Sequence, residues 1–105
     1  MADAKAARRD PRRELEELDR VFKALAHPAR RQILMVLHFR GGEMTAGGIA
    51  GRFACSWPTT SRHLKQLEQA GLVTVESVGR ERIYRIDKAL LGRTAGEWLR
   101  WFEKV

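Results

Sequence analysis

The chain has 105 residues, which is enough for one domain with a single core and too few for two. Hydrophobic residues make up 44% and charged residues 31%, as in a folded globular protein, and the longest apolar run, Ile33 to Leu37, is far shorter than the roughly 20 residues that cross a bilayer. The 20 Lys and Arg residues exceed the 13 Asp and Glu residues by seven, so the charge favours a polyanion as partner.

Most of the excess positive charge lies in the middle of the chain, where residues 27–86 carry nine basic and four acidic side chains. Fifteen of the 20 basic residues are Arg, whose guanidinium group suits phosphate and guanine, although the codon usage of a GC-rich genome would give the same bias. The basic N-terminus is followed by acidic, amphipathic sequence and does not resemble a secretory signal. We therefore expect a cytoplasmic protein without membrane contact.

The first predicted helix, residues 11–25, opens at Pro11 and carries a narrow apolar stripe of the kind that forms a seam between paired helices. The members of this stripe are Leu15, Leu18, Phe22 and Leu25. The dipeptide His27-Pro28 ends this helix and begins a second one, which runs to Phe39 and is stopped by Gly41-Gly42. Because the second helix is apolar around most of its circumference, we expect it at the centre of the core.

The middle of the chain predicts two more helices. Thr45 can cap a short third helix that extends to Phe53, although three glycines within it disfavour the helical state. Ser56 is the N-cap candidate of a fourth helix, about residues 56–70, which ends at Gly71. The inward stripe of this fourth helix consists of Thr60, Leu64 and Leu67.

A β-hairpin and a closing helix complete the chain. Two runs rich in β-branched residues, Leu72 to Val78 and Arg82 to Ile86, are joined at Gly79-Arg80 and predict a hairpin. The last helix, about residues 88–103, has a stripe formed by Leu91, Ala95, Trp98 and Phe102.

This order predicts a mainly α fold with a β-hairpin wing, a winged helix-turn-helix with an additional dimerisation helix at each end. Residues 11–105 would form this single domain, with the recognition helix at about 56–70, the wing at about 72–86 and the C-terminal dimerisation helix at about 88–103. We expect residues 1–10 to be a disordered basic tail.

Four sequence motifs occur in succession, and together they cover most of residues 15–90. They are FKALAHPARRQIL at 22–34, SWPTTSRHL at 56–64, LEQAGLV at 67–73 and GRERIYRI at 79–86. In this order the chain resembles the ArsR-type winged-helix transcriptional repressors, in particular members without a metal site. The resemblance implies a homodimer, built from the first and last helices, that blocks transcription at a palindromic operator in double-stranded DNA.

The candidate DNA-binding residues lie on the fourth helix and the wing. Polar side chains of the outer helix face can read base edges, whereas arginines at a hairpin tip can follow the backbone or enter the minor groove. The residues are Ser56, Thr59, Ser61, Arg62, His63, Gln66, Arg80 and Arg82. A solvated polar face is the alternative interpretation of both groups. Arg30 and Arg31 could contact flanking phosphates or pair with acids of the first helix.

The predicted dimer interface combines both terminal helices, because their apolar stripes are too large to leave exposed on a small domain. Its residues are Leu15, Leu18, Phe22, Leu91, Trp98 and Phe102. The aromatic residues of the last helix could instead line an effector pocket. No effector is identified from the sequence.

We expect neither a metal site nor a cofactor. Residues 45–53 contain no cysteine pair, no histidine follows His63, and the one cysteine, Cys55, cannot form an intramolecular disulfide. Cys55 precedes a helix N-terminus, so a redox-responsive repressor is one alternative, and packing in a buried turn is the other.

Two further interpretations concern the class of protein. A winged helix can serve as a protein-interaction module, but the outer face of the fourth helix lacks the apolar residues that such a contact favours. An enzyme is not expected, because Ser61 and His63, two positions apart on one helix, point away from each other. Trp57 departs from the small or polar residue expected before Pro58, and either packs on the turn or lies against the DNA backbone.

Overall fold

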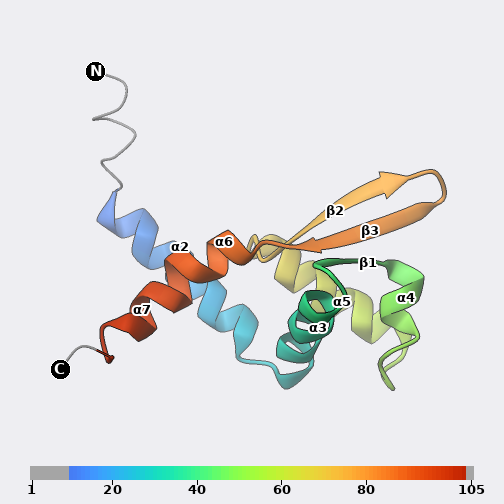
Figure 1. Cartoon of the computed structure of the whole chain (residues 1–105), viewed down its shortest axis with the longest axis horizontal. Coiled ribbons are helices and arrows are strands. Elements are labelled where there is room, and N and C mark those ends of the chain that lie inside the picture. The colour runs from blue at the N-terminus through green and yellow to red at the C-terminus, as the bar shows by residue number, and fades with distance from the viewer. Residues whose placement is uncertain (1–9, 104–105) are drawn as a thin grey trace.

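The structure, a computed structural model, describes residues 10–103 and shows a helical domain with a small sheet (Figure 1). In chain order the elements are α2 (Pro11–Leu25), α3 (Pro28–Phe39), β1 (Glu43–Thr45), α4 (Ala46–Ala50), α5 (Trp57–Gln69), β2 (Val73–Val78), β3 (Glu81–Ile86), α6 (Lys88–Leu91), the π-helical segment η1 (Gly92–Gly96) and α7 (Glu97–Arg100). The predicted fold class is confirmed. Of the tail predicted at 1–10, only Asp10 is described, and it caps α2 by accepting a hydrogen bond from the Arg12 amide.

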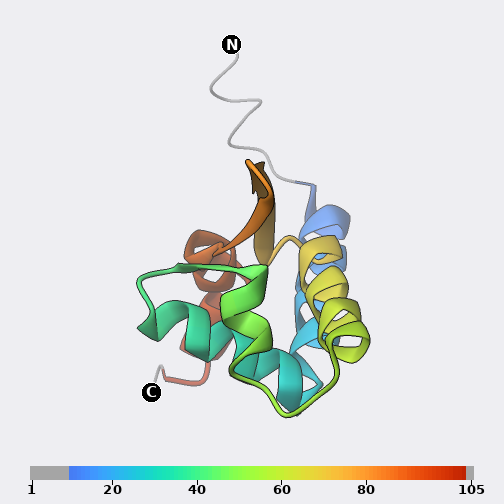
Figure 2. The ribbon, with the colours of Figure 1, turned by 90° about the vertical axis from the view of Figure 1, so that its right-hand side faces the viewer.

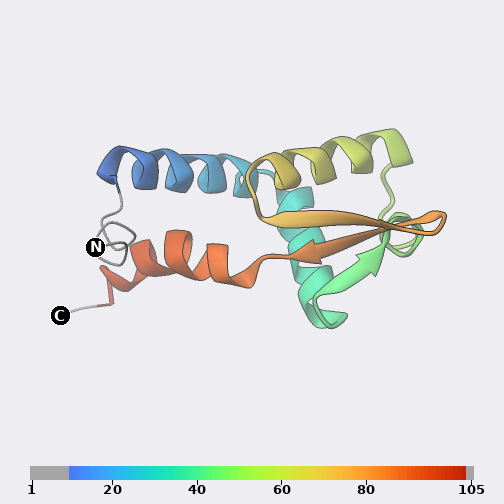
Figure 3. The ribbon, with the colours of Figure 1, turned by 90° about the horizontal axis from the view of Figure 1, so that it is seen from above.

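The elements form two groups at opposite ends of the molecule. At one end α2 lies beside the helix formed by α6, η1 and α7, and at the other the hairpin β2–β3 extends from the body (Figure 3). Helix α3 crosses between them, and its buried residues are Ile33, Leu34 and Leu37. No helix within residues 10–103 has both the length and the apolar character that a bilayer crossing requires.

Two arginines hold the junction between α2 and α3. Arg31 Nη1 donates to the Leu25 carbonyl at 2.7 Å, and Arg30 Nη1 lies 3.5 Å from the carbonyls of Lys23 and Ala24. These carbonyls belong to the end of α2, where cations are favoured by the helix dipole. Neither side chain forms an ion pair with an acid of α2, so both of them cap the end of that helix.

The helix-turn-helix unit consists of α4, a short loop and α5. Thr45 caps α4 as predicted, since its Oγ1 accepts a hydrogen bond from the Gly48 amide at 3.1 Å. The helix ends at Ala50, so Phe53 is not part of it and the predicted length is wrong. The five-residue helix contains two glycines and is followed by Gly51, and this composition opposes a further turn.

The sheet has three strands where the sequence predicts a hairpin. Strand β1 pairs antiparallel with β3, giving the order β1-β3-β2, with Met44 opposite Tyr84. A strand of three residues, of which Met44 and Thr45 are half-buried, is too short to show a periodicity, and β1 forms because β3 offers it a free edge. The β2–β3 turn is Gly79-Arg80, and Gly79 has a φ of +61°, which glycine adopts without steric cost.

The predicted C-terminal helix contains a π-helical turn. Thr94, which is buried, donates from Oγ1 to the Leu90 carbonyl at 2.6 Å within this segment. A π turn takes in one extra residue and rotates the faces before and after it relative to each other. Ala95 packs into the core, whereas Trp98 and Phe102 of the same predicted stripe are exposed.

Truncation of the inner face of α5 should destabilise the domain. The Leu64 side chain is 1% exposed, so Leu64→Ala is expected to lower the free energy of unfolding by about 2–5 kcal/mol. The neighbouring Lys65→Ala, at an exposed position, should change it by less than about 0.5 kcal/mol. Urea unfolding of both variants at one protein concentration measures the difference, and equal midpoints would contradict this packing of α5.

Candidate nucleic-acid interface

The face of α5 that points away from the core is polar. Burial of Thr60, Leu64 and Leu67 fixes the rotation of the helix about its axis, as the sequence predicts. Arg62 and Gln66 are consequently exposed on the opposite side. Their side chains match the donors and acceptors that guanine and adenine present in the major groove.

A small hydrogen-bonded group occupies the first turns of α5. Thr59 Oγ1 accepts from Ser56 Oγ at 3.2 Å and from Arg62 Nη2 at 3.4 Å. Arg62 keeps further N–H donors that this contact does not use. The guanidinium group is therefore held over the outer face of α5 while donors for a base edge stay available.

His63 does not lie with the freely exposed residues, contrary to its predicted position. Its Nδ1 accepts a hydrogen bond from Arg30 Nε at 3.3 Å, and its ring lies 5.0 Å from the ring of His27. Partial burial, followed by the charges of His27, Arg30 and Arg62, lowers the pKa of His63. His63 is thus a neutral acceptor that joins α5 to the α2–α3 junction. Ser61, also in the predicted set, is half-buried.

The wing carries its free cations at the tip. Arg80 lies in the turn and Arg82 follows on β3, both exposed, and the Arg82 guanidinium carbon lies 5.6 Å from the centre of the Tyr84 ring. This cation–π contact directs Arg82 along the strand. The tip therefore presents two guanidinium groups, in agreement with the predicted placement.

A third arginine of the wing has a structural role. Arg85 donates from Nε to Glu43 at 3.0 Å and from Nη1 to Glu76 at 2.6 Å, so one side chain bridges all three strands. These two hydrogen bonds raise the pKa of Arg85 above its usual value. Two carboxylates neutralise this cation, and we do not include it among the candidate DNA contacts.

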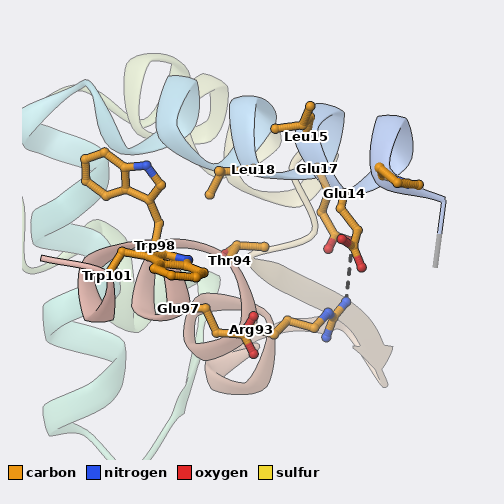
Figure 4. A pocket seen from close by; sticks show the side chains of 10 residues that line it. Glu14, Leu15, Glu17, Leu18, Arg93, Thr94, Glu97, Trp98 and Trp101 are labelled. Carbon is orange, nitrogen blue, oxygen red and sulfur yellow. Dashed lines mark hydrogen bonds and ion pairs between the residues drawn. The ribbon is translucent and has the colours of Figure 1, made fainter. Parts of the chain in front are cut away.

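An apolar surface spans α2 and the C-terminal helix. Phe22 and Trp98 pack edge to face at 5.2 Å, and Trp98 lies 4.8 Å from Phe102. Beside them is a groove of about 430 Å³, whose apolar lining consists of Leu15, Leu18, Trp98 and Trp101 (Figure 4). Charged side chains also line it, and two of them, Glu17 and Arg93, form an ion pair at 3.5 Å. Leu15 is 61% and Phe102 71% exposed, whereas Leu91, predicted for this surface, packs against the core.

Cys55, just before α5, and Trp57, its first residue, are both exposed. Cys55 is exposed, so the expectation that it packs in a buried turn is wrong. Trp57 is 39% exposed at the start of α5. Cys55 lies in the loop between α4 and α5, and Trp57 is the first residue of α5.

The described residues contain no group of three His, Cys, Asp or Glu side chains that could hold a metal ion. His27 and His63 come together, but Arg30 is their neighbour, and a guanidinium group cannot ligate a cation. The chemistry of this cluster is hydrogen bonding between helices.

Comparison with known proteins relates this geometry to a family. Residues 25–76 match a helix-turn-helix domain model. The chain is 37% identical to the transcriptional repressor SdpR of Bacillus subtilis over 87 residues, which cover 83% of this chain and 94% of the relative. The chain belongs to the ArsR family of transcriptional regulators.

Two solved ArsR-family structures share the fold of this member. An ArsR-like regulator from Rhodococcus is 35% identical with a TM-score of 0.68, covering 85% of this chain and 89% of that one. The homodimeric winged helix-turn-helix domain of a possible ArsR-family regulator from Mycobacterium bovis is 30% identical with a TM-score of 0.69, covering 94% and 93%. The helix-turn-helix of this ArsR-family chain therefore comprises α4 and α5, followed by the wing.

The pKa of His63 should lie below 6.5 in the folded protein. Between the pKa of His63 in the unfolded chain and its lower pKa in the folded protein, the unfolded chain binds more protons. The free energy of unfolding should therefore fall as the pH drops from the first value to the second, and stay constant below the second. Arg30→Met removes one of the neighbouring charges, so it should raise the pKa of His63 without fully restoring it. NMR titration of the His63 ring protons measures the pKa in the wild-type protein and in Arg30→Met, with Arg31→Met as the control. An unchanged pKa in Arg30→Met would contradict the contact.

Proposed function

We propose that this protein is a homodimeric transcriptional repressor that binds an inverted-repeat operator in double-stranded DNA. The observation that carries the proposal is the outer face of α5, where Thr59, Arg62 and Gln66 are presented by a helix whose opposite face is buried. A helix of this kind fits the major groove and reads base edges through its side chains.

The wing would follow the same duplex on one side of α5. Arg80 and Arg82 are exposed at its tip, where they reach phosphates or a narrow minor groove. Phosphate contacts of this type add affinity and orientation but little sequence information. In this arrangement Arg62 selects the sequence and the wing strengthens binding to any sequence.

Dimerisation is supported by the apolar surface formed by α2, α7 and the turn that follows α7. Leu15, Trp98, Trp101 and Phe102 are all exposed, and large apolar side chains that gather on one surface mark an interaction site. The Mycobacterium bovis relative is described as homodimeric. A two-fold axis would place two copies of α5 about 34 Å apart, one helical turn of DNA.

Repression would follow from occupancy of the operator in the cytoplasm, since a bound dimer prevents RNA polymerase from using the same DNA. Footprinting upstream of the protein's own coding sequence tests whether it also regulates itself. A protein-interaction role for α5 has less support, because the residues on its outer face are polar. No small-molecule effector is part of the proposal.

Loss of Arg62 should reduce sequence discrimination. With an operator selected from random duplexes, Arg62→Ala should weaken specific binding by about 1–3 kcal/mol and leave binding to unrelated DNA nearly unchanged. Arg80→Ala should weaken both and lower the dependence of affinity on salt. Fluorescence anisotropy across a salt series measures both effects. The assignment of the two arginines fails if Arg80→Ala has the wild-type salt slope or Arg62→Ala keeps full discrimination.

Dimerisation should depend on Phe102 and not on a matched exposed phenylalanine. Phe102 is 71% exposed beside Trp98, and Phe39 is 73% exposed beside His38 at the end of α3. Phe102→Glu should raise the dimer dissociation constant by about tenfold or more, because a two-fold interface contains the change twice. Phe39→Glu should leave the constant unchanged. Sedimentation velocity tests both, and a monomeric wild-type protein at micromolar concentration would refute the dimer.

A further inference from the structure

A small basic cleft lies between the C-terminal halves of α2 and α5. It has a volume of about 160 Å³ and is lined by Arg20, Lys23, Arg30, Gln66 and Gln69, with two alanines between them. Three side chains are cations, two are amides that can donate hydrogen bonds, and none is a carboxylate. This donor set suits an anion with several oxygen atoms.

The cations of this cleft are available to a ligand. Within residues 10–103 the side chains of Arg20 and Lys23 form no ion pair or hydrogen bond. Arg30 is held by His63 through Nε and by the end of α2 through Nη1, and no residue among 10–103 pairs with its Nη2. Arg30 is therefore a positioned cation, whereas Arg20 and Lys23 are exposed ones that converge with it from the neighbouring helix.

The position of the cleft relative to α5 indicates what anion it meets. Gln66 belongs both to the cleft and to the outer face of α5 that would read the major groove. Helices α2 and α5 lie along the same side of the molecule (Figure 2), and the cleft is at the end of α5 remote from the tip of the wing (Figure 3). A helix in the major groove has a phosphate strand on either side of it.

We propose that the cleft between α2 and α5 binds a phosphate group of the DNA backbone. This site rests on the proposed function and adds a second phosphate contact to each half-site, on the side of α5 that faces the two-fold axis. Arg20 and Lys23 neutralise the phosphate, and Gln69 and Arg30 Nη2 donate to its oxygen atoms. The recognition helix is then held at both ends, by the wing at one and by α2 at the other.

The test compares three variants that each remove one positive charge from an exposed position. Arg20→Gln and Lys23→Gln change the cleft, and Arg40→Gln changes the end of α3, on the opposite side of the molecule from α2 and α5 (Figure 2). Anisotropy with operator and with unrelated DNA across a salt series gives the affinity and the slope of its logarithm against the logarithm of salt. Equal thermal unfolding of the variants shows that each is folded.

Loss of one phosphate contact per protomer should lower the magnitude of the salt slope by about 1.8 for the dimer, since each neutralised phosphate contributes about 0.9. Because each cleft variant keeps the other cations, Arg20→Gln and Lys23→Gln should each show a part of this change with both DNAs, and Arg40→Gln should keep the wild-type slope. Wild-type slopes in both cleft variants would overturn the proposal while leaving DNA binding by α5 intact. Wild-type protein that binds no DNA would overturn the proposed function as well.

Free inorganic phosphate is the other anion that would fit the donors of this cleft. Inorganic phosphate titrated into the wild-type protein and Arg20→Gln, followed by NMR of the α2 and α5 amides, distinguishes the two. Saturable binding that Arg20→Gln abolishes, combined with an unchanged salt slope for DNA, would assign the cleft to a free phosphate and overturn the backbone contact. Weak binding of inorganic phosphate together with the lowered slope supports the proposal.

Discussion

One guanidinium group connects the three helices on which the interface depends. Arg30, at the start of α3, contacts carbonyls in the last turn of α2 through Nη1, and its Nε donates a hydrogen bond to His63 of α5. Helix α2, which carries part of the apolar surface, and α5, which carries the polar face, are thereby both fixed to one half-buried side chain at the start of α3. The orientation of α5 relative to α2 follows from this junction as well as from burial of Leu64 and Leu67.

The sequence predicts the elements that have a strong periodic signal and misses contacts that depend on distant parts of the chain. Both ends of α3 follow from Pro28 and Gly41-Gly42, and the inner face of α5 follows from its spacing of apolar residues. Strand β1 is too short to have a pattern. The contact between Arg30 and His63 spans 33 residues, and no local feature of either segment predicts it.

The same limit applies to the candidate site. Residue type and helical period place Thr59, Arg62 and Gln66 on the outer face, but they do not separate Arg85, which is neutralised, from Arg80 and Arg82, which are free. The net charge of +7 is a property of composition, whereas the distribution of unpaired cations is a property of the fold. The basic cleft illustrates this, because its lining residues come from helices far apart in the sequence.

The positions of the three tryptophans determine what the intrinsic fluorescence of this protein reports. Trp57 stands at the start of α5, and Trp98 and Trp101 stand on the apolar surface, so all three indoles are on exposed faces and the core contains Tyr84 as its aromatic residue. Intrinsic emission therefore originates from the two surfaces and not from the interior. A change in its wavelength follows the solvent around those surfaces, so fluorescence distinguishes assembly and ligand contact from the packing of the core.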